Sequence, residues 1–174
     1  MKKLLIVVDY QNDFVNGALG FEGADALAPL LSARIAAARE SGEDVIFTFD
    51  THGEDYLNTS EGKNLPVPHC IDGTEGHALF PAIAELVEEG DRVICKPSFG
   101  SAELFDLLRG SDYESVELCG LVTDICVVSN AILAKTALPE AEITVNAALV
   151  DSFDKSKHEA ALSVMESVQI RVIR

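Results

Sequence analysis

The stretch Leu118-Cys119-Gly120-Leu121-Val122-Thr123-Asp124-Ile125-Cys126 decides the fold, because a strand ends in it and a helix begins. The β-prone residues before it break at Gly120, and a helix is expected from about Thr123. Cys126 would then lie in the first helical turn, where unpaired backbone N–H groups and the helix dipole favour a thiolate. Two interpretations are open: Cys126 is a nucleophile, or it is a small buried apolar residue, as free cysteines often are.

Apolar β-prone runs alternate with amphipathic helical segments on both sides of this stretch. Strands are expected at residues 4–8, 45–49, 92–95, 115–119, 142–145 and 168–173, and helices at 26–40, 78–89, 102–109, 123–138 and 155–167. Strands joined by crossovers predict a mostly parallel six-stranded sheet with helices on both faces, a three-layer α/β fold. The length of the chain predicts that residues 1–174 form a single domain.

Composition excludes several classes of partner. The formal net charge of −16 would repel nucleic acid and anionic membranes. The apolar run after Lys3 ends at Asp9, too early for a signal peptide, and no run approaches the roughly 18 apolar residues of a membrane helix. The four cysteines show no paired spacing, which indicates free thiols in a cytoplasmic protein.

Four polar positions follow four different predicted strands. Asp9 ends the first strand, Asp50 the second, Lys96 the third, and Cys126 follows the fourth. One such residue is usually a helix cap or a solvated charge. Because ligands of parallel sheets bind beyond the carboxyl ends of the strands, the convergence of four predicts a functional site at that edge.

The long polar segment 51–76 carries two of the four histidines. Asp50 and His52 are two residues apart in an extended segment, so their side chains point to one face. His69, returned by the loop, would complete a three-ligand metal site with open positions. The alternative is that His52 and His69 are loop residues without a partner.

The chain resembles the isochorismatase-like cysteine hydrolases, and within them the nicotinamidase/pyrazinamidase branch. The resemblance runs from the first strand to the helix after the fourth strand. It rests on motifs that are specific in combination: Asp9-Tyr10-Gln11-Asn12-Asp13-Phe14, Asp50-Thr51-His52, Pro68-His69-Cys70 with Gly73-Thr74, Lys96, and Gly120-Leu121-Val122-Thr123-Asp124-Ile125-Cys126.

This resemblance implies a catalytic triad of Asp9, Lys96 and Cys126. A protonated thiol is a poor nucleophile, so Asp9 would accept its proton and Lys96 would stabilise the thiolate. Attack on an amide carbon would give a thioester that water hydrolyses. The resemblance also implies an oxyanion hole at the backbone N–H groups of Val122 and Cys126, with a cis peptide between Leu121 and Val122.

The resemblance further implies that Asp50, His52 and His69 bind a divalent ion. Zinc is expected first, with manganese or iron as alternatives, and the ion would orient the ring nitrogen of the substrate. Glu61 or Glu54 is a candidate fourth ligand from its place in the loop.

The expected substrate-binding residues are Phe14, Leu19 and Val122. A ring-stacking aromatic residue is common in this branch at the position where this chain has Pro66. Tyr56 or Phe99 could replace that aromatic ring, or the pocket could hold a compound other than a pyridine.

The remaining histidines and cysteines have simpler interpretations. His77 and His158 are expected at the surface, and Cys95 and Cys119 in the core. Cys70 follows a predicted metal ligand, but adjacent side chains in an extended loop point apart, so it is not expected to bind the metal.

The resulting prediction is a hydrolase that cleaves the C–N bond of a small amide, with nicotinamide as the first candidate substrate. The alternatives are another amide or a ureido or carbamoyl compound, a vinyl ether as in isochorismatases, and a non-catalytic thiol sensor. Isochorismatases are disfavoured because they lack the nucleophilic cysteine and the Asp-x-His pair. A homo-oligomer is expected from the resemblance.

Overall fold

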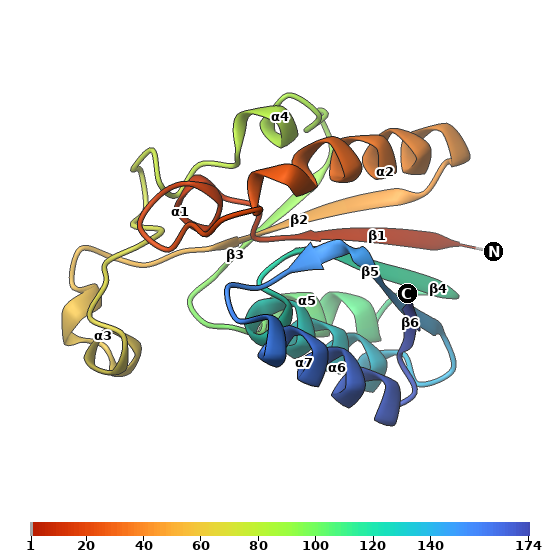
Figure 1. Cartoon of the computed structure of the whole chain (residues 1–174). Helices are drawn as coiled ribbons and strands as arrows, with labels where there is room; N and C mark the ends of the chain where they lie inside the picture. Colours follow the sequence, from red (N-terminus) through yellow and green to blue (C-terminus); the bar gives the residue numbers. More distant parts are fainter. Residues whose placement is uncertain (1) are drawn as a thin grey trace.

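The computed structural model describes residues 2–174, and six strands in it form one parallel sheet (Figure 1). Their order across the sheet is β3-β2-β1-β4-β5-β6, and every adjacent pair is parallel. The predicted three-layer α/β fold is confirmed. The strands are β1 (Lys3–Val8), β2 (Asp44–Asp50), β3 (Arg92–Lys96), β4 (Ser115–Leu121), β5 (Glu142–Asp151) and β6 (Arg171–Ile173).

Helices cover both faces of the sheet (Figure 1). One face carries α2 (Ala28–Ser41) and α4 (Pro81–Ala84), and the other carries α5 (Ala102–Arg109), α6 (Val128–Ala137) and α7 (Lys155–Ser167). Alternate residues of β1 serve the two faces: Leu4, Ile6 and Val8 pack in one hydrophobic cluster, and Leu5 and Val7 in the other. Within residues 2–174, no helix combines the length and apolar character needed to cross a membrane.

Several predicted boundaries are wrong. The helix expected at 78–89 is regular only over Pro81–Ala84, and the acidic residues that follow would oppose the negative end of a longer helix dipole. The expected helix 26–40 consists of η1 (Asp25–Leu27) and α2. The strand expected at 168–173 is observed only over Arg171–Ile173 as β6. It begins later because α7 continues to Ser167 and Gln169 has a left-handed φ of 65°, which a strand does not allow. The strand expected at 142–145 continues to Asp151 as β5.

The segment expected to be a long loop contains local structure of its own. It includes η2 (Tyr56–Asn58) and α3 (Ser60–Asn64), where the Thr59 hydroxyl caps α3 by accepting the Gly62 N–H. A further short helix, α1 (Asn12–Val15), follows β1. The short helices α1 and α3 lie at the carboxyl edge of the sheet (Figure 1). The strand order reverses between β1 and β4.

Gly120 is the residue of β4 that allows close approach to β1 at this edge. It pairs with Val8, its φ is 107°, and a Cβ built there would lie 2.1 Å from the Val8 carbonyl oxygen. No other residue type fits this conformation and contact.

We expect Gly120→Ala to lower the free energy of unfolding by about 3 kcal/mol or more, since it adds both backbone strain and overlap. The matched control is Gly110→Ala, where the nearest atoms to the added Cβ lie 3.6 Å away and the change should stay within about 1 kcal/mol. Urea unfolding of both variants measures the difference. Equal losses would contradict this account of Gly120.

Candidate active site

Three buried side chains from different elements meet at the carboxyl edge of the sheet. Asp9 follows β1, Lys96 ends β3, and Cys126 lies in η3 (Thr123–Val127) after β4. The Lys96 Nζ atom lies 2.6 Å from Oδ2 of Asp9 and 3.4 Å from Sγ of Cys126. The structure thus brings together the three residues predicted to form a triad, and their catalytic role remains a prediction.

Asp9 is held by its backbone and by contacts to both of its carboxylate oxygens. Its φ of 44° is left-handed, which aspartate tolerates better than most residues. The Thr48 hydroxyl donates to Oδ1 at 2.6 Å, and the Asp9 N–H donates to the Thr48 carbonyl. Oδ2 forms the ion pair with Lys96 Nζ at 2.6 Å.

The three groups strongly influence one another's ionisation. Burial raises the pKa of the Asp9 carboxyl, against the opposing charge of Lys96. Burial, followed by the Asp9 charge, raises the pKa of the Cys126 thiol. Burial alone would lower the pKa of Lys96, but Asp9, Cys126 and Asp50 outweigh it and raise that pKa. Lys96 therefore stays protonated, and its charge opposes the effect of burial on both Asp9 and Cys126.

Hydrogen bonds connect the segment that contains Cys126 and α6 to the loop that follows Lys96. Asn130 of α6 is fully buried and donates to the carbonyls of Cys126 and Phe99, while its side-chain oxygen accepts the Ser101 N–H. In the same loop the Ser98 carbonyl accepts a hydrogen bond from Lys96 Nζ at 3.0 Å. Asn130 therefore fixes both the cysteine and the lysine relative to each other.

The turn that contains Cys126 differs from the predicted regular helix 123–138. Residues 123–127 form a π-helical turn and α6 continues only from Val128 to Ala137. The turn is anchored from outside: Nδ1 of His158 lies 2.9 Å from the Thr123 hydroxyl, and the Ser152 hydroxyl donates to Asp124. Such π-helical turns are frequent at functional sites.

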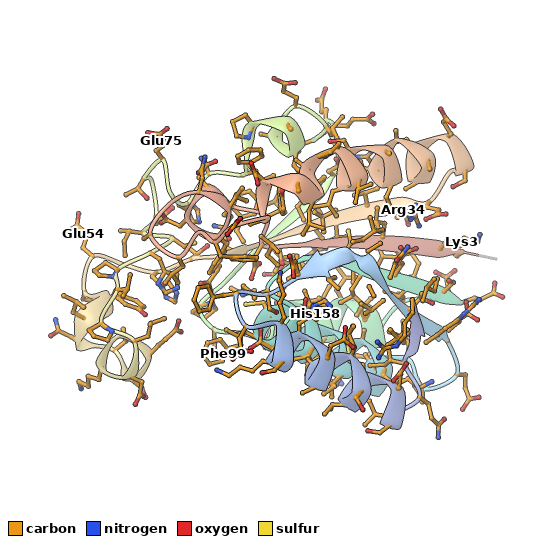
Figure 2. All side chains as sticks on the ribbon, viewed as in Figure 1. Lys3, Arg34, Glu54, Glu75, Phe99 and His158 are labelled. Atoms are coloured by element: carbon orange, nitrogen blue, oxygen red, sulfur yellow. The ribbon has the colours of Figure 1, made fainter. Side chains whose placement is uncertain are left out.

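The expectation that His158 lies at the surface is wrong, because its contact with Thr123 buries it under the turn. Figure 2 shows it near the start of α7. His77 is half-buried, with Nε2 2.8 Å from the Thr51 hydroxyl.

The peptide bond between Leu121 and Val122 is cis, as the resemblance implied. Val122 is the N-cap of η3 and Cys126 lies in its single turn. The two backbone N–H groups predicted to form the oxyanion hole thus belong to this turn and its N-cap, where helices leave N–H groups without intrahelical partners.

Four side chains beside the triad could hold a metal ion. The candidate ligand atoms of Asp50, His52, Glu61 and His69 all lie within 4.8 Å of one another. Oδ2 of Asp50 lies 3.0 Å from His52 Nε2 and 3.3 Å from His69 Nε2, and Oε1 of Glu61 lies 3.7 Å from each. Two imidazole nitrogens and two carboxylates fit a divalent transition metal.

Of the two candidates for a fourth ligand, Glu61 lies in this cluster. Glu54 is exposed and projects outward from the loop (Figure 2). The carboxyl group of Glu61 has a raised pKa, chiefly through burial and then through the charge of Asp50.

Hydrogen bonds outside the cluster orient its members. Nδ1 of His69 donates to the Val67 carbonyl at 2.8 Å, which leaves Nε2 for the metal. The buried Gln11 side chain accepts the Asp50 N–H and donates to the Asp50 carbonyl. Asp13 accepts the Cys70 N–H at 2.8 Å and so holds the loop next to His69.

A cavity of about 480 Å³ lies beside the nucleophile turn, and Phe14, Leu19 and Val122 all line it. Leu65 and Ile125 line both this cavity and a second one that reaches His52 and Glu61. The three predicted substrate-binding residues thus share one cavity, which is mostly apolar, and their role in binding stays a prediction.

The structure distinguishes between the two candidate aromatic replacements. Tyr56 is buried against His52 and His69, and its hydroxyl donates to the Leu65 carbonyl. Phe99 is 45% exposed and lines the second cavity (Figure 2). Phe99 is therefore the ring available to a ligand.

The other cysteines are not grouped with Cys126. Cys119 and Cys70 are buried, and burial raises the pKa of each thiol. The prediction that Cys95 lies in the core is wrong: it is exposed, because β3 is an edge strand.

Sequence reasoning did not assign the positioning residues Thr48, Gln11, Asp13 and Asn130. Gln11 and Asp13 belong to the motif Asp9-Tyr10-Gln11-Asn12-Asp13-Phe14. That motif indicated the family, but the sequence assigned no role to these two residues. Thr48 is a hydroxyl in an otherwise apolar strand and shares a strand face with Asp50. Nothing in the local sequence marks Asn130, because its three partners are defined only by tertiary contacts.

Comparison with known proteins identifies the family. A family model described as the isochorismatase domain matches residues 3–174, so the chain belongs to the isochorismatase family. The nicotinamidase/pyrazinamidase of Mycobacterium tuberculosis is 31% identical over 143 residues, which cover 74% of this chain and 76% of the relative.

Solved structures agree with this assignment. The nicotinamidase PncA from Bacillus subtilis has a TM-score of 0.87 at 32% identity and covers 100% of both chains. The pyrazinamidase of Pyrococcus horikoshii, solved in complex with zinc, has a TM-score of 0.85 at 26% identity over 100% of this chain and 99% of that one. The resemblance seen in the sequence is confirmed.

We expect a divalent ion to stabilise the fold, because it would neutralise the adjacent carboxylates of Asp50 and Glu61. At about a hundred times the dissociation constant, the melting temperature should rise by about 5 to 10 °C. Calorimetry with zinc, manganese and iron(II) in turn measures this. His69→Ala should lose the rise and His77→Ala should keep it. The same rise in both variants would contradict the assignment of His69.

Proposed function

We propose that this chain is a metal-dependent cysteine amidohydrolase that converts nicotinamide to nicotinate and ammonia. The observation that carries the proposal is the contact of Lys96 Nζ with both Asp9 and Cys126 in a buried site. The relatives named nicotinamidase at 31% and 32% identity support the choice of substrate.

In the proposed first step, Cys126 gives its proton to Asp9 and attacks the amide carbon. The thiolate is stabilised by Lys96, whose raised pKa keeps it charged. The backbone N–H groups of Val122 and Cys126 would stabilise the oxyanion, a contribution of about 3–4 kcal/mol for each donor.

In the second step, Asp9 returns the proton to the leaving nitrogen, and the C–N bond breaks to give ammonia and a thioester. The same carboxylate then takes a proton from water, which attacks the thioester and releases the acid and the thiol. Asp9 therefore acts in turn as base and acid, which suits a carboxyl with a raised pKa.

Asp50, His52, His69 and Glu61 would hold the metal ion, with zinc as the first candidate. A bound ion would supply a Lewis-acid contact that orients the ring nitrogen of the substrate. Support comes from the donor set and from the zinc complex of the Pyrococcus horikoshii relative.

Phe14, Leu19 and Val122 would line the substrate pocket, and Phe99 would be the aromatic wall of the adjoining second cavity. Pro66 is exposed and lines neither of the two cavities beside the site. The prediction of a single domain over residues 1–174, the cytoplasmic location and the homo-oligomer stay predictions.

We expect Cys126→Ala, Asp9→Asn and Lys96→Ala each to reduce the rate of ammonia release by at least about a thousandfold. The reason is that the three residues of a triad act as a unit, so the loss of any one removes most of the rate enhancement. Cys95→Ala is the matched control and should keep the wild-type rate, since this cysteine is exposed on β3. Substantial turnover by Cys126→Ala would exclude the covalent mechanism.

The substrate is tested by ammonia release from nicotinamide, with and without chelator, beside other small amides and ureido acids. We expect chelator-sensitive turnover of nicotinamide. If nicotinamide is inert and another amide is hydrolysed, the triad stands and the pyridine assignment is wrong.

A further inference from the structure

We infer that Thr48 is a positioning residue that directs the proton of Cys126 to Oδ2 of Asp9. The inference rests on the proposed function. It adds that Thr48 determines which oxygen of the Asp9 carboxylate receives the proton. It is argued from the different surroundings of the two carboxylate oxygens.

The first observation is that Oδ1 of Asp9 is already occupied. The Thr48 hydroxyl is fully buried and donates to Oδ1 at 2.6 Å, so its own proton fills that side of the carboxylate. A proton placed on Oδ1 would have to displace this hydrogen bond between two fully buried side chains, which is costly.

The second observation is that Oδ2 faces the reacting groups. It lies 2.6 Å from Lys96 Nζ, which is 3.4 Å from Sγ of Cys126. When the S–H bond breaks, the proton forms a bond to Oδ2, and the electron pair stays on sulfur beside the lysine. The neutral acid then donates from Oδ2 to the leaving nitrogen.

The third observation is that the backbone holds Asp9 directly beside Thr48. The Asp9 N–H donates to the Thr48 carbonyl at 3.1 Å, and Val8 is paired with Thr48 in the sheet. Together with the left-handed φ of Asp9, this attachment places the carboxyl group between the Thr48 hydroxyl on one oxygen and Lys96 Nζ on the other.

Other ionisable groups also influence Asp9. Lys96 favours the carboxylate, and Asp50 disfavours it. The thiols of Cys126 and Cys70 lie within electrostatic reach from the nucleophile turn and the long loop. Thr48→Val leaves all four in place and removes one hydroxyl, so it isolates the hydrogen bond.

The experiment is the pH profile of Thr48→Val, measured both as kcat/KM for nicotinamide and as alkylation of Cys126 by iodoacetamide in a Cys95→Ser background. Loss of a hydrogen bond to the carboxylate raises the pKa of Asp9, so the acid limb of both profiles should move to higher pH by about one unit. The value of kcat should fall about tenfold or more with KM little changed.

Two variants control for a purely structural effect. Thr48→Ser keeps the hydroxyl, so the acid limb of both profiles should lie at the same pH as in the wild type. Thr144→Val removes another buried threonine hydroxyl, on β5, and should not move the limb. If Thr48→Val does not fold, Thr48→Ala removes the same hydroxyl and gives the same comparison.

An unmoved acid limb in folded Thr48→Val, or an equal shift in Thr144→Val, would overturn the inference. Failure of the wild type to hydrolyse any amide would instead overturn the proposed function. The alkylation profile would still test Thr48 in that case, because it requires only the Cys126 thiolate.

Discussion

The rest of the site depends on the buried ion pair between Lys96 and Asp9. Both side chains are withdrawn from solvent, so each charge would be costly alone. The fold meets this cost with further contacts: Thr48 donates to the carboxylate, and the Ser98 carbonyl accepts from the ammonium. The two carboxylate oxygens thus have different partners, and the lysine that binds one of them also lies 3.4 Å from the Cys126 sulfur.

The same edge of the sheet holds a second concentration of charge. Asp50 and Glu61 lie close together with two histidines, and hydrogen bonds to the backbone orient His69 and Asp50. Glu61 is on α3, a short helix that projects at the end of the molecule (Figure 1). An ion bound there would connect this helix to β2. Metal binding and the shape of the neighbouring cavity would then be coupled, since Leu65 directly follows α3 and lines that cavity.

The cavity beside the nucleophile turn is lined mainly by apolar side chains from separate segments. Phe14 follows β1, Leu65 belongs to the long loop, and Phe153, which is 81% exposed, follows β5. Such a lining favours a small ligand with an apolar body and leaves its polar recognition to the triad and the metal cluster. The proposed function therefore places selectivity among amides on loops, and the chemistry at the sheet edge.

The sequence by itself determined the order of the strands along the chain, the parallel fold and the polar residues at the strand ends. These follow from local patterns: continuous apolar runs, crossover helices and motifs such as Gly120 to Cys126. Only the tertiary structure decided which strands are neighbours, that Glu61 and not Glu54 joins the cluster, and that His158 lies buried beside Thr123. It also decided the contacts that Thr48 and Asn130 make. The physical reason is that a hydrogen bond between residues distant in the chain leaves no periodic or local signal, because its partners are brought together only when the sheet and its helices pack.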